Sequence, residues 1–299
     1  MFHWLATLAL LTGASDPRAL QHGCDDKKAA DCFELAALYH YGGPVAKDEP
    51  RAATLYQKAC EGGHAPGCLS LGLMYSLGKG VARDDARAVA LFAQGCDGGA
   101  ATSCSVLAHL YQEGKSVAKN AARSFELARK ACDLEARECL GLGLKYKLGE
   151  GVPQDFAQAA AVYKRGCDGG SPDACSALGQ LHARGDGVPE DPGRAVSLYE
   201  KACDGGDGFA CDRLAGAYAT GAGVPQDLPR AAALFEKGCD GKNFIACAHL
   251  GRLYATGAGV PRDLAHARAL LKQSCDQGYP FACNDLASLA GQDDGQPPK

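Results

Sequence analysis

Cysteine is the residue type in this sequence with the clearest capacity for chemistry, because a thiol can form disulfides, bind metals or act as a nucleophile. The chain has sixteen cysteines, and all of them fall into eight close pairs. The pairs are Cys24/Cys32, Cys60/Cys68, Cys96/Cys104, Cys132/Cys139, Cys167/Cys175, Cys203/Cys211, Cys239/Cys247 and Cys275/Cys283. An even number in a regular pattern favours disulfides and an oxidising compartment. The alternative is a cytosolic protein with buried, reduced thiols, since cysteine also packs as a small apolar residue.

Other candidate chemical motifs are weak. Two Ser-x-x-Lys sequences, Ser76-Leu-Gly-Lys79 and Ser116-Val-Ala-Lys119, match a spacing that serine β-lactamases use on one helical turn. Both are expected in loops, and neither Ser-Asp-Asn nor Lys-Thr-Gly accompanies them. His-x-x-x-His, Cys-x-x-Cys-His and Gly-x-Gly-x-x-Gly before a helix are all absent, and the gap within each cysteine pair exceeds that of zinc ribbons. The sequence therefore predicts no catalytic residue, no metal site and no cofactor.

The cysteine pairs recur with the period of a structural repeat. The first cysteines are 36 residues apart at positions 24, 60, 96 and 132, and again at 203, 239 and 275. Cys167 follows Cys132 after 35 residues, because that one pair is a residue shorter. A fixed period of this size indicates a solenoid, in which each repeat buries its apolar face against its neighbours. We therefore expect one continuous array instead of two globular domains.

Residues 67–99 show the repeating unit. Its first helical face comprises Cys68, Leu71, Gly72 and Tyr75. Gly78-Lys-Gly-Val81 interrupts this helix, and Asp84 is a suitable N-cap for a second one. The second helix presents Ala88, Leu91, Phe92 and Cys96 before Gly98 and Gly99 end it. We call the two helices of each repeat helix A and helix B.

This arrangement predicts where the cysteines lie. The first member of each pair closes a helix B, and the second begins the next helix A. Because a tight turn between antiparallel helices brings those ends together, we expect a disulfide within each of the eight pairs. Closing so short a loop contributes roughly 2–3 kcal/mol in the chain-entropy model.

Comparison of the repeats with one another indicates a candidate binding surface. Counted from the second cysteine, positions +3, +4 and +7 of helix A keep their character, whereas +2, +5 and +9 change freely. The variable positions share one face, away from the packing stripe, and we expect helix A to line the concave side of the solenoid. The candidate ligand contacts on this face are Glu34, His109, Glu113, Gln180, Arg184, Arg213, His249 and Arg252. The alternative is a solvated face without a ligand.

The two ends of the chain differ from the repeats. Residues 1–11 are an apolar run followed by Thr12-Gly-Ala14, which predicts a signal peptide over residues 1–14, although no Lys or Arg precedes the run. The alternative is an apolar helix that caps the array. Residues 15–290 are expected to form about seven repeats with degenerate ends, and the polar residues 291–299 a disordered tail.

Charge limits the classes of partner. The net charge is 31 − 35 = −4 and no basic block occurs, so nucleic acid and anionic membranes are not expected partners. The apolar run at the N-terminus is too short to span a bilayer.

The motifs resemble those of the Sel-one-like repeat (SLR) family, a subclass of tetratricopeptide-like α/α solenoids. The resemblance covers residues 15–290 and is carried by Leu-Gly-x-x-Tyr, Gly-x-Gly-Val-x-x-Asp and Ala-x-x-Leu-Tyr/Phe, as in Leu71–Tyr75, Gly80 to Asp84 and Ala88 to Phe92. Ordinary tetratricopeptide repeats fit less well, because their period is about 34 residues. The cysteine pairs are most similar to those of the Helicobacter cysteine-rich secreted proteins. That resemblance implies disulfide-linked helix pairs, penicillin binding and weak β-lactamase activity. A haem-associated assembly factor of the mitochondrial intermembrane space is a second cysteine-rich relative.

The expected fold is all-α, a right-handed α/α solenoid of helix pairs stapled by disulfides. The resemblance to a family of binding scaffolds, together with the extended surface of a solenoid, predicts a protein- or peptide-binding scaffold. We expect a monomer, secreted or periplasmic, whose partner the sequence does not identify. The alternatives are a weak β-lactam hydrolase of the cell envelope and a haem or assembly factor.

Overall fold

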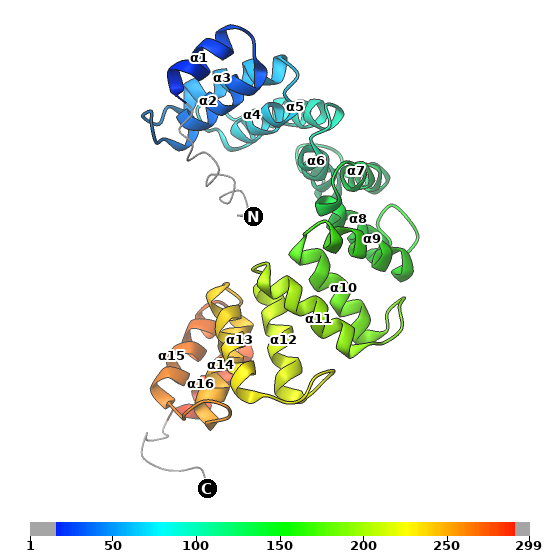
Figure 1. The fold of residues 1–299 in the computed structure, drawn as a ribbon, viewed down its shortest axis with the longest axis vertical. Helices are drawn as coiled ribbons and strands as arrows, with labels where there is room; N and C mark the ends of the chain where they lie inside the picture. The colour runs from blue at the N-terminus through cyan, green and yellow to red at the C-terminus, as the bar shows by residue number, and fades with distance from the viewer. Residues whose placement is uncertain (1–15, 291–299) are drawn as a thin grey trace. The chain divides into compact units, whose positions relative to one another are not determined.

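The computed structural model describes residues 16–290, and all regular structure in this range is helical (Figure 1). The predicted signal peptide and the predicted tail lie outside the described residues. The A helices are α2 (Ala29–Tyr41), α4 (Ala65–Leu77), α6 (Ala101–Glu113), α8 (Cys139–Leu148), α10 (Pro172–Arg184), α12 (Gly208–Thr220), α14 (Phe244–Thr256) and α16 (Pro280–Leu289). The B helices are α1 (Pro17–Asp25), α3 (Glu49–Glu61), α5 (Asp85–Asp97), α7 (Ala121–Leu134), α9 (Phe156–Asp168), α11 (Pro192–Asp204), α13 (Leu228–Asp240) and α15 (Leu264–Asp276). The α/α solenoid predicted from the repeat period is thus confirmed.

The chain divides into two compact units. Within the described residues, the first comprises 16–141 and 150–152, and the second comprises 142–149 and 153–290. The boundary falls within α8. Among the helices of residues 16–290, none is long and apolar enough to cross a membrane.

Helix B begins at a side-chain cap, as the sequence predicts. Asp84 accepts a hydrogen bond from the backbone N–H of Arg87 at 2.9 Å, which satisfies a donor that the first helical turn leaves open. The backbone N–H of Asp84 donates to the carbonyl of Tyr75 at 3.0 Å, and this bond closes the loop between helix A and helix B. The corresponding caps of α3, α7, α9, α11, α13 and α15 are Asp48, Asn120, Asp155, Asp191, Asp227 and Asp263.

Glycine is required in the loop between helix A and helix B for two reasons. Gly223 has a φ of +78°, a left-handed conformation that other residues rarely adopt. A Cβ atom at this position would also lie 2.5 Å from the carbonyl carbon of Pro192, at the start of the preceding helix B. The loop therefore packs directly against the backbone of the neighbouring repeat.

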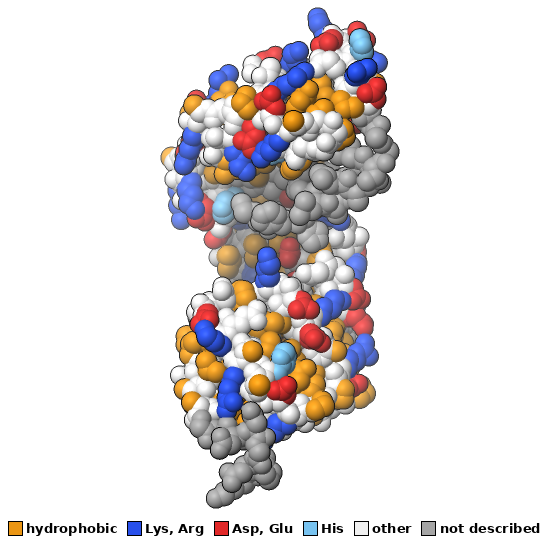
Figure 2. Space-filling model, turned by 90° about the vertical axis from the view of Figure 1, so that its left-hand side faces the viewer, with side chains coloured by type: hydrophobic (Ala, Val, Ile, Leu, Met, Phe, Trp, Pro, Cys, Tyr) orange, Lys and Arg blue, Asp and Glu red, His pale blue; other side chains and the backbone are white. Residues whose placement is uncertain are grey.

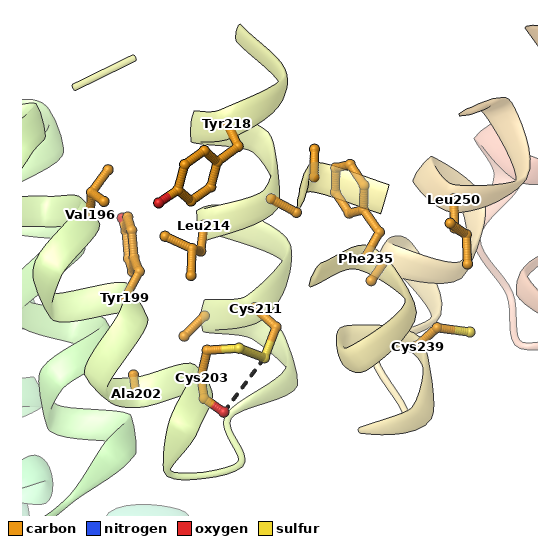
Figure 3. Close-up of a cluster of buried hydrophobic side chains, with 14 of the residues drawn as sticks. Val196, Tyr199, Ala202, Cys203, Cys211, Leu214, Tyr218, Phe235, Cys239 and Leu250 are labelled. Carbon is orange, nitrogen blue, oxygen red and sulfur yellow. Dashed lines mark hydrogen bonds between the residues drawn. A yellow bond between two sulfur atoms is a disulfide. The ribbon is translucent and has the colours of Figure 1, made fainter. Parts of the chain in front are cut away.

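Disulfides join all eight cysteine pairs, and no cysteine of the described residues is free. The paired residues are Cys24–Cys32, Cys60–Cys68, Cys96–Cys104, Cys132–Cys139, Cys167–Cys175, Cys203–Cys211, Cys239–Cys247 and Cys275–Cys283. Cys203 is the penultimate residue of α11 and Cys211 lies in the first turn of α12, with their Cα atoms 4.7 Å apart (Figure 3). Each cross-link thus ties the end of a helix B to the start of the next helix A.

The second cysteine of most pairs differs slightly from its expected place. The sequence analysis placed it at the beginning of helix A, whereas the structure places it at the fourth residue of the helix in seven pairs. These residues are Cys32 of α2, Cys68 of α4, Cys104 of α6, Cys175 of α10, Cys211 of α12, Cys247 of α14 and Cys283 of α16. The reason is that helix A already begins after a turn of three residues, such as 205–207 between α11 and α12.

The shorter pair follows a different local path. Cys139 is the first residue of α8, and the 3-10 turn η2 (Ala136–Glu138) takes the place of the first helical turn. The Cα atoms of Cys132 and Cys139 lie 4.2 Å apart. The one-residue deletion is therefore absorbed in the turn, and the cross-link is kept.

Burial of the cysteines depends on their place in the array. Cys275 and Cys283 are partly exposed, and the other fourteen cysteines are buried. The reason is that α16 is the last helix of the described residues, so no later helix in that range covers this pair.

Buried side chains from both helix layers fill the space between repeats. In the second unit, Tyr199 of α11, Leu214 and Tyr218 of α12, and Phe235 of α13 belong to one cluster (Figure 3). Leu214 is 1% exposed and Phe235 is 5% exposed. Burying an apolar side chain of this size contributes about 1.5–3 kcal/mol, so contacts of this kind hold successive helices together.

Small residues at position +4 of helix A allow helix B to approach closely. Tyr163 of α9 is fully buried, and its ring lies over Gly143 of α8. A Cβ atom on Gly143 would lie 2.3 Å from the Cε1 atom of Tyr163. A Cβ atom on Gly141, in the same helix, would meet no atom within 4 Å beyond its chain neighbours and the backbone of its own helix.

These two glycines provide a matched pair of substitutions. Gly143→Ala is expected to destabilise the protein by about 1–3 kcal/mol, because the buried Tyr163 ring must move. Gly141→Ala is expected to stabilise it by about 0.5–1 kcal/mol through helix propensity alone. Equilibrium unfolding in urea measures both changes. Equal effects of the two substitutions would contradict the packing described here.

Two half-buried histidines in the first unit favour the neutral form. The ring of His64 lies 4.6 Å from that of Phe33, and its Nδ1 atom is buried without a hydrogen-bond partner. The Nδ1 atom of His40 is also buried without a partner. Burial lowers the pKa of both imidazoles, against smaller opposing effects of Glu34 on His64 and of Glu49 on His40.

The lowered pKa values predict a pH-dependent stability. Below the ordinary imidazole pKa of about 6.5, the unfolded chain binds protons that the folded protein does not. The free energy of unfolding should therefore fall as the pH drops from about 7.5 to about 5.5, where most carboxylates remain ionised. Urea titrations at several pH values in this range give the free energy of unfolding as a function of pH. This free energy should change less steeply with pH in His40→Gln and His64→Gln than in the parent. His109→Gln, at an exposed histidine, is the control. If the pH dependence of the free energy of unfolding were unchanged in both His40→Gln and His64→Gln, burial of these two histidines would not be its cause.

Candidate functional site

Four of the eight candidate residues line one cavity in the second unit. Gln180 and Arg184 come from α10, Arg213 from α12 and His249 from α14, around a volume of about 430 Å³. They occupy variable positions of helix A in three successive repeats. The sequence prediction placed these residues on one face, and the structure brings them together. The lower part of Figure 2 shows basic, acidic and histidine side chains among apolar ones over the C-terminal repeats.

The two arginines of this cavity lie near a buried tyrosine. Burial raises the pKa of the Tyr199 hydroxyl, and the charges of Arg213 and Arg184 oppose that effect. The guanidinium of Arg213 also stacks on the ring of Phe209, with its central carbon 4.6 Å from the ring centroid. Within residues 16–290, neither arginine forms an ion pair with a carboxylate.

A buried acid that was not among the candidate residues also lines the cavity. Asp212 of α12 is 4% exposed, and its carboxylate lies 2.7 Å from Nδ1 of His249. The His249 ring in turn packs against Phe235 at 5.0 Å between centroids. Asp212 occupies position +1 of helix A, where no other repeat has an acidic residue. That exception to the repeat pattern is the signal that could have identified it.

The other four candidates do not line this cavity. Arg252 pairs with Asp285 of α16 at 2.6 Å, so its charge is already compensated. Glu113 pairs with Lys115 at 3.4 Å, and His109 is exposed. Glu34 lies in the first unit, where it acts on His64. The eight residues therefore do not form a single site.

The candidate list also omitted apolar residues on the same helix A face. Tyr41 of α2 and Leu73 and Leu77 of α4 are 52%, 41% and 63% exposed and line a small cavity of about 120 Å³ in the first unit. Counted from the second cysteine, these residues are at positions +9, +5 and +9. They therefore occupy the same variable positions as the charged candidates. Exposed apolar side chains that gather in this way are typical of contact surfaces.

The Ser-x-x-Lys motifs do not form serine–lysine pairs. Ser76 lies in the last turn of α4, not in the loop that the sequence analysis expected, and its hydroxyl donates to the carbonyl of Leu73 at 2.9 Å. Ser116 does lie in a loop, where its hydroxyl donates to Asp85 at 3.1 Å. Both hydroxyls thus bond to groups other than their lysines. Every cysteine is in a disulfide, so this structure offers no free thiol that could ligate haem or a metal.

Comparison with known proteins identifies the repeat. The Sel1 repeat model matches seven consecutive segments, residues 25–64, 65–99, 101–135, 139–171, 172–207, 208–243 and 245–279. No curated protein matches the chain.

Solved structures of Sel1 repeat proteins have the same fold. A protective antigen of uropathogenic Escherichia coli with an SLR fold is 28% identical, with a TM-score of 0.78 over 94% of this chain. The chain spans only 60% of the length of that structure. A Sel1 repeat protein from Oxalobacter formigenes is 29% identical, with a TM-score of 0.73 over 91% of this chain and 79% of its own. The cysteine-rich protein B of Helicobacter pylori is 33% identical over 46% of this chain and 99% of its own, with a TM-score of 0.38. Because the family model covers nearly all of the described residues, the chain belongs to the Sel1 repeat family.

Proposed function

We propose that this protein is an exported scaffold that binds proteins or peptides through the variable face of its A helices. The observation that carries the proposal is the cavity of the second unit, to which variable positions of α10, α12 and α14 contribute. A cavity built from several repeats accommodates a ligand that runs across them, as extended polypeptide does. The family membership supports a binding role, because stacked repeats create extended binding surfaces.

Contacts between helices support the A layer as the inner one. In the second unit α12 lies against α14 and α14 against α16, whereas the contacts of α10 with α12 and those between successive B helices are weaker. In the first unit α4 lies against α6 in the same way. Helices on the inner side of a curved stack are closer to one another than those on the outer side. This relation favours the concave location of the variable positions.

The disulfides support export. Eight cross-links between neighbouring helices indicate an oxidising, extracytoplasmic compartment. We propose secretion or a periplasmic location, with the protein acting as a monomer. One structural relative is described as a protective antigen, and an antigen accessible to antibodies is consistent with a protein outside the cytoplasm.

Blocking the cavity tests the proposal. Gly216 lines the cavity and has open space where a side chain would begin. Gly216→Trp is expected to fill the cavity without disturbing the core, whereas Gly216→Ala leaves it open. In selections from an unbiased library of displayed peptides, the parent and Gly216→Ala should enrich the same sequences, and Gly216→Trp should lose them. The proposal fails if the folded parent enriches no peptides, or if Gly216→Trp retains them all.

A further inference from the structure

The cavity of the second unit contains two cations without anionic partners. Arg184 is the last residue of α10 and Arg213 lies in the next helix A, α12, yet both act electrostatically on the same Tyr199 hydroxyl. Both side chains line the cavity. In the described chain, neither guanidinium is paired with a carboxylate. Two guanidinium groups therefore line the same cavity, and within residues 16–290 neither has a hydrogen-bond or ion-pair partner.

The carboxylates near these arginines do not compensate them. Asp212 is held by His249 at 2.7 Å on the buried side of the cavity. Glu190, an exposed residue of the loop after α10, also lines the cavity but forms no ion pair with either arginine. The planar guanidinium group binds carboxylates through paired, charge-assisted hydrogen bonds and is easily desolvated. The pair Arg184 and Arg213 thus fits a carboxylate supplied by a ligand.

A second hollow, a mostly apolar groove, shares the lining residue Phe209 with this cavity. The groove has a volume of about 550 Å³ and lies along the turns that precede α12, α14 and α16. Its apolar lining includes Phe209, Phe244, Ile245 and Tyr279, and Asp207, Lys242, Asn243 and Gln277 form its polar edge. Phe209 lines both hollows, and it lies one helical turn before Arg213, which stacks on its ring at 4.6 Å. The charged cavity and the groove are therefore adjacent at Phe209.

The adjacency of the charged cavity and the groove at Phe209 indicates the size and the chemical class of the ligand. A small anion bound at Arg184 and Arg213 would leave the groove beyond Phe209 empty. An extended chain rises about 3.3 Å per residue, so two to four residues reach from one helical turn into the groove. Successive side chains of such a chain can then be acidic in the cavity and apolar in the groove.

We propose that the second unit binds an extended peptide segment whose Asp or Glu side chain pairs with Arg184 and Arg213 and whose aromatic or aliphatic side chain, two to four residues away, enters the groove beside Phe209. This inference names the ligand class of the proposed function and rests on it. The apolar face around Leu73 and Leu77 in the first unit is a separate surface and takes no part.

Resynthesised peptides test the carboxylate requirement. Each sequence enriched by the parent protein is made with an acetylated N-terminus and an amidated C-terminus, so that only side chains carry carboxylates. Its Asp and Glu residues are replaced one at a time by Asn and Gln, and dissociation constants are measured by calorimetry. One such replacement is expected to weaken binding at least about tenfold, because a desolvated guanidinium loses its partner. Replacing the neighbouring apolar residue by Ser should weaken binding as well.

A double-mutant cycle assigns the effect to the two arginines. In Arg184→Ala/Arg213→Ala, the acidic peptide and its amide counterpart should bind with equal affinity. Arg213→Lys should bind more weakly than the parent, because an ammonium group lacks the paired donors. Lys164→Ala, on helix B α9, serves as the control and should bind both peptides as the parent does. Unchanged circular dichroism and melting temperature establish that the variants are folded.

The outcomes separate this inference from the proposed function. If peptides are enriched but their amide replacements bind equally well, the carboxylate inference is wrong and the scaffold proposal stands. If free succinate binds as tightly as the peptides, the ligand is a small anion and the peptide class is wrong. If a free C-terminal carboxylate is required in place of an acidic side chain, the source of the carboxylate is wrong. If no peptide binds, the proposed function itself fails.

Discussion

The covalent link between the end of one helix B and the start of the next helix A is the constraint on which this structure depends. The linked Cα atoms lie 4.2 to 4.8 Å apart in all eight pairs, so each disulfide holds the two helix ends together across their short turn. Nearly all of these cysteines are buried, so each disulfide also contributes apolar contacts. Helices of thirteen residues are marginal in isolation, and cross-links at every corner reduce the entropy that their unfolded chain would gain.

Close helix packing and the binding surface follow from this constraint. Gly143 and the equivalent small residues let a tyrosine, phenylalanine or leucine of helix B occupy the interior, which turns the rest of helix A outward. Because successive repeats stack in the second unit, variable positions of α10, α12 and α14 line a common space. The cavity is thus a product of the stacking, and its chemistry is set by residues that the fold leaves free to vary.

Much of the fold could be predicted from the sequence, since its determinants are local. The turn within each cysteine pair, the N-cap at Asp84 and the glycine loop each act within a few residues, and the structure contains all three. The grouping of Arg184 with Arg213 across repeats depends on how far one repeat turns relative to the next, and a sequence period does not contain that rotation. Asp212 was missed because the comparison of repeats selected only positions +2, +5 and +9, and Asp212 lies at +1. Tyr41, Leu73 and Leu77 were missed because exposed apolar residues resemble core residues until their exposure is known.

The disulfide pairing itself is open to a direct measurement. An acidic residue follows the first cysteine of every pair, at Asp25, Glu61, Asp97, Asp133, Asp168, Asp204, Asp240 and Asp276. Cleavage of the unreduced protein at Asp and Glu, after alkylation of any free thiols, therefore cuts each connecting turn and leaves the flanking peptides joined only through sulfur. Mass spectrometry of protein taken from its native compartment should find eight linked pairs, each between cysteines seven or eight positions apart. Alkylated cysteines, or links between distant repeats, would contradict the account.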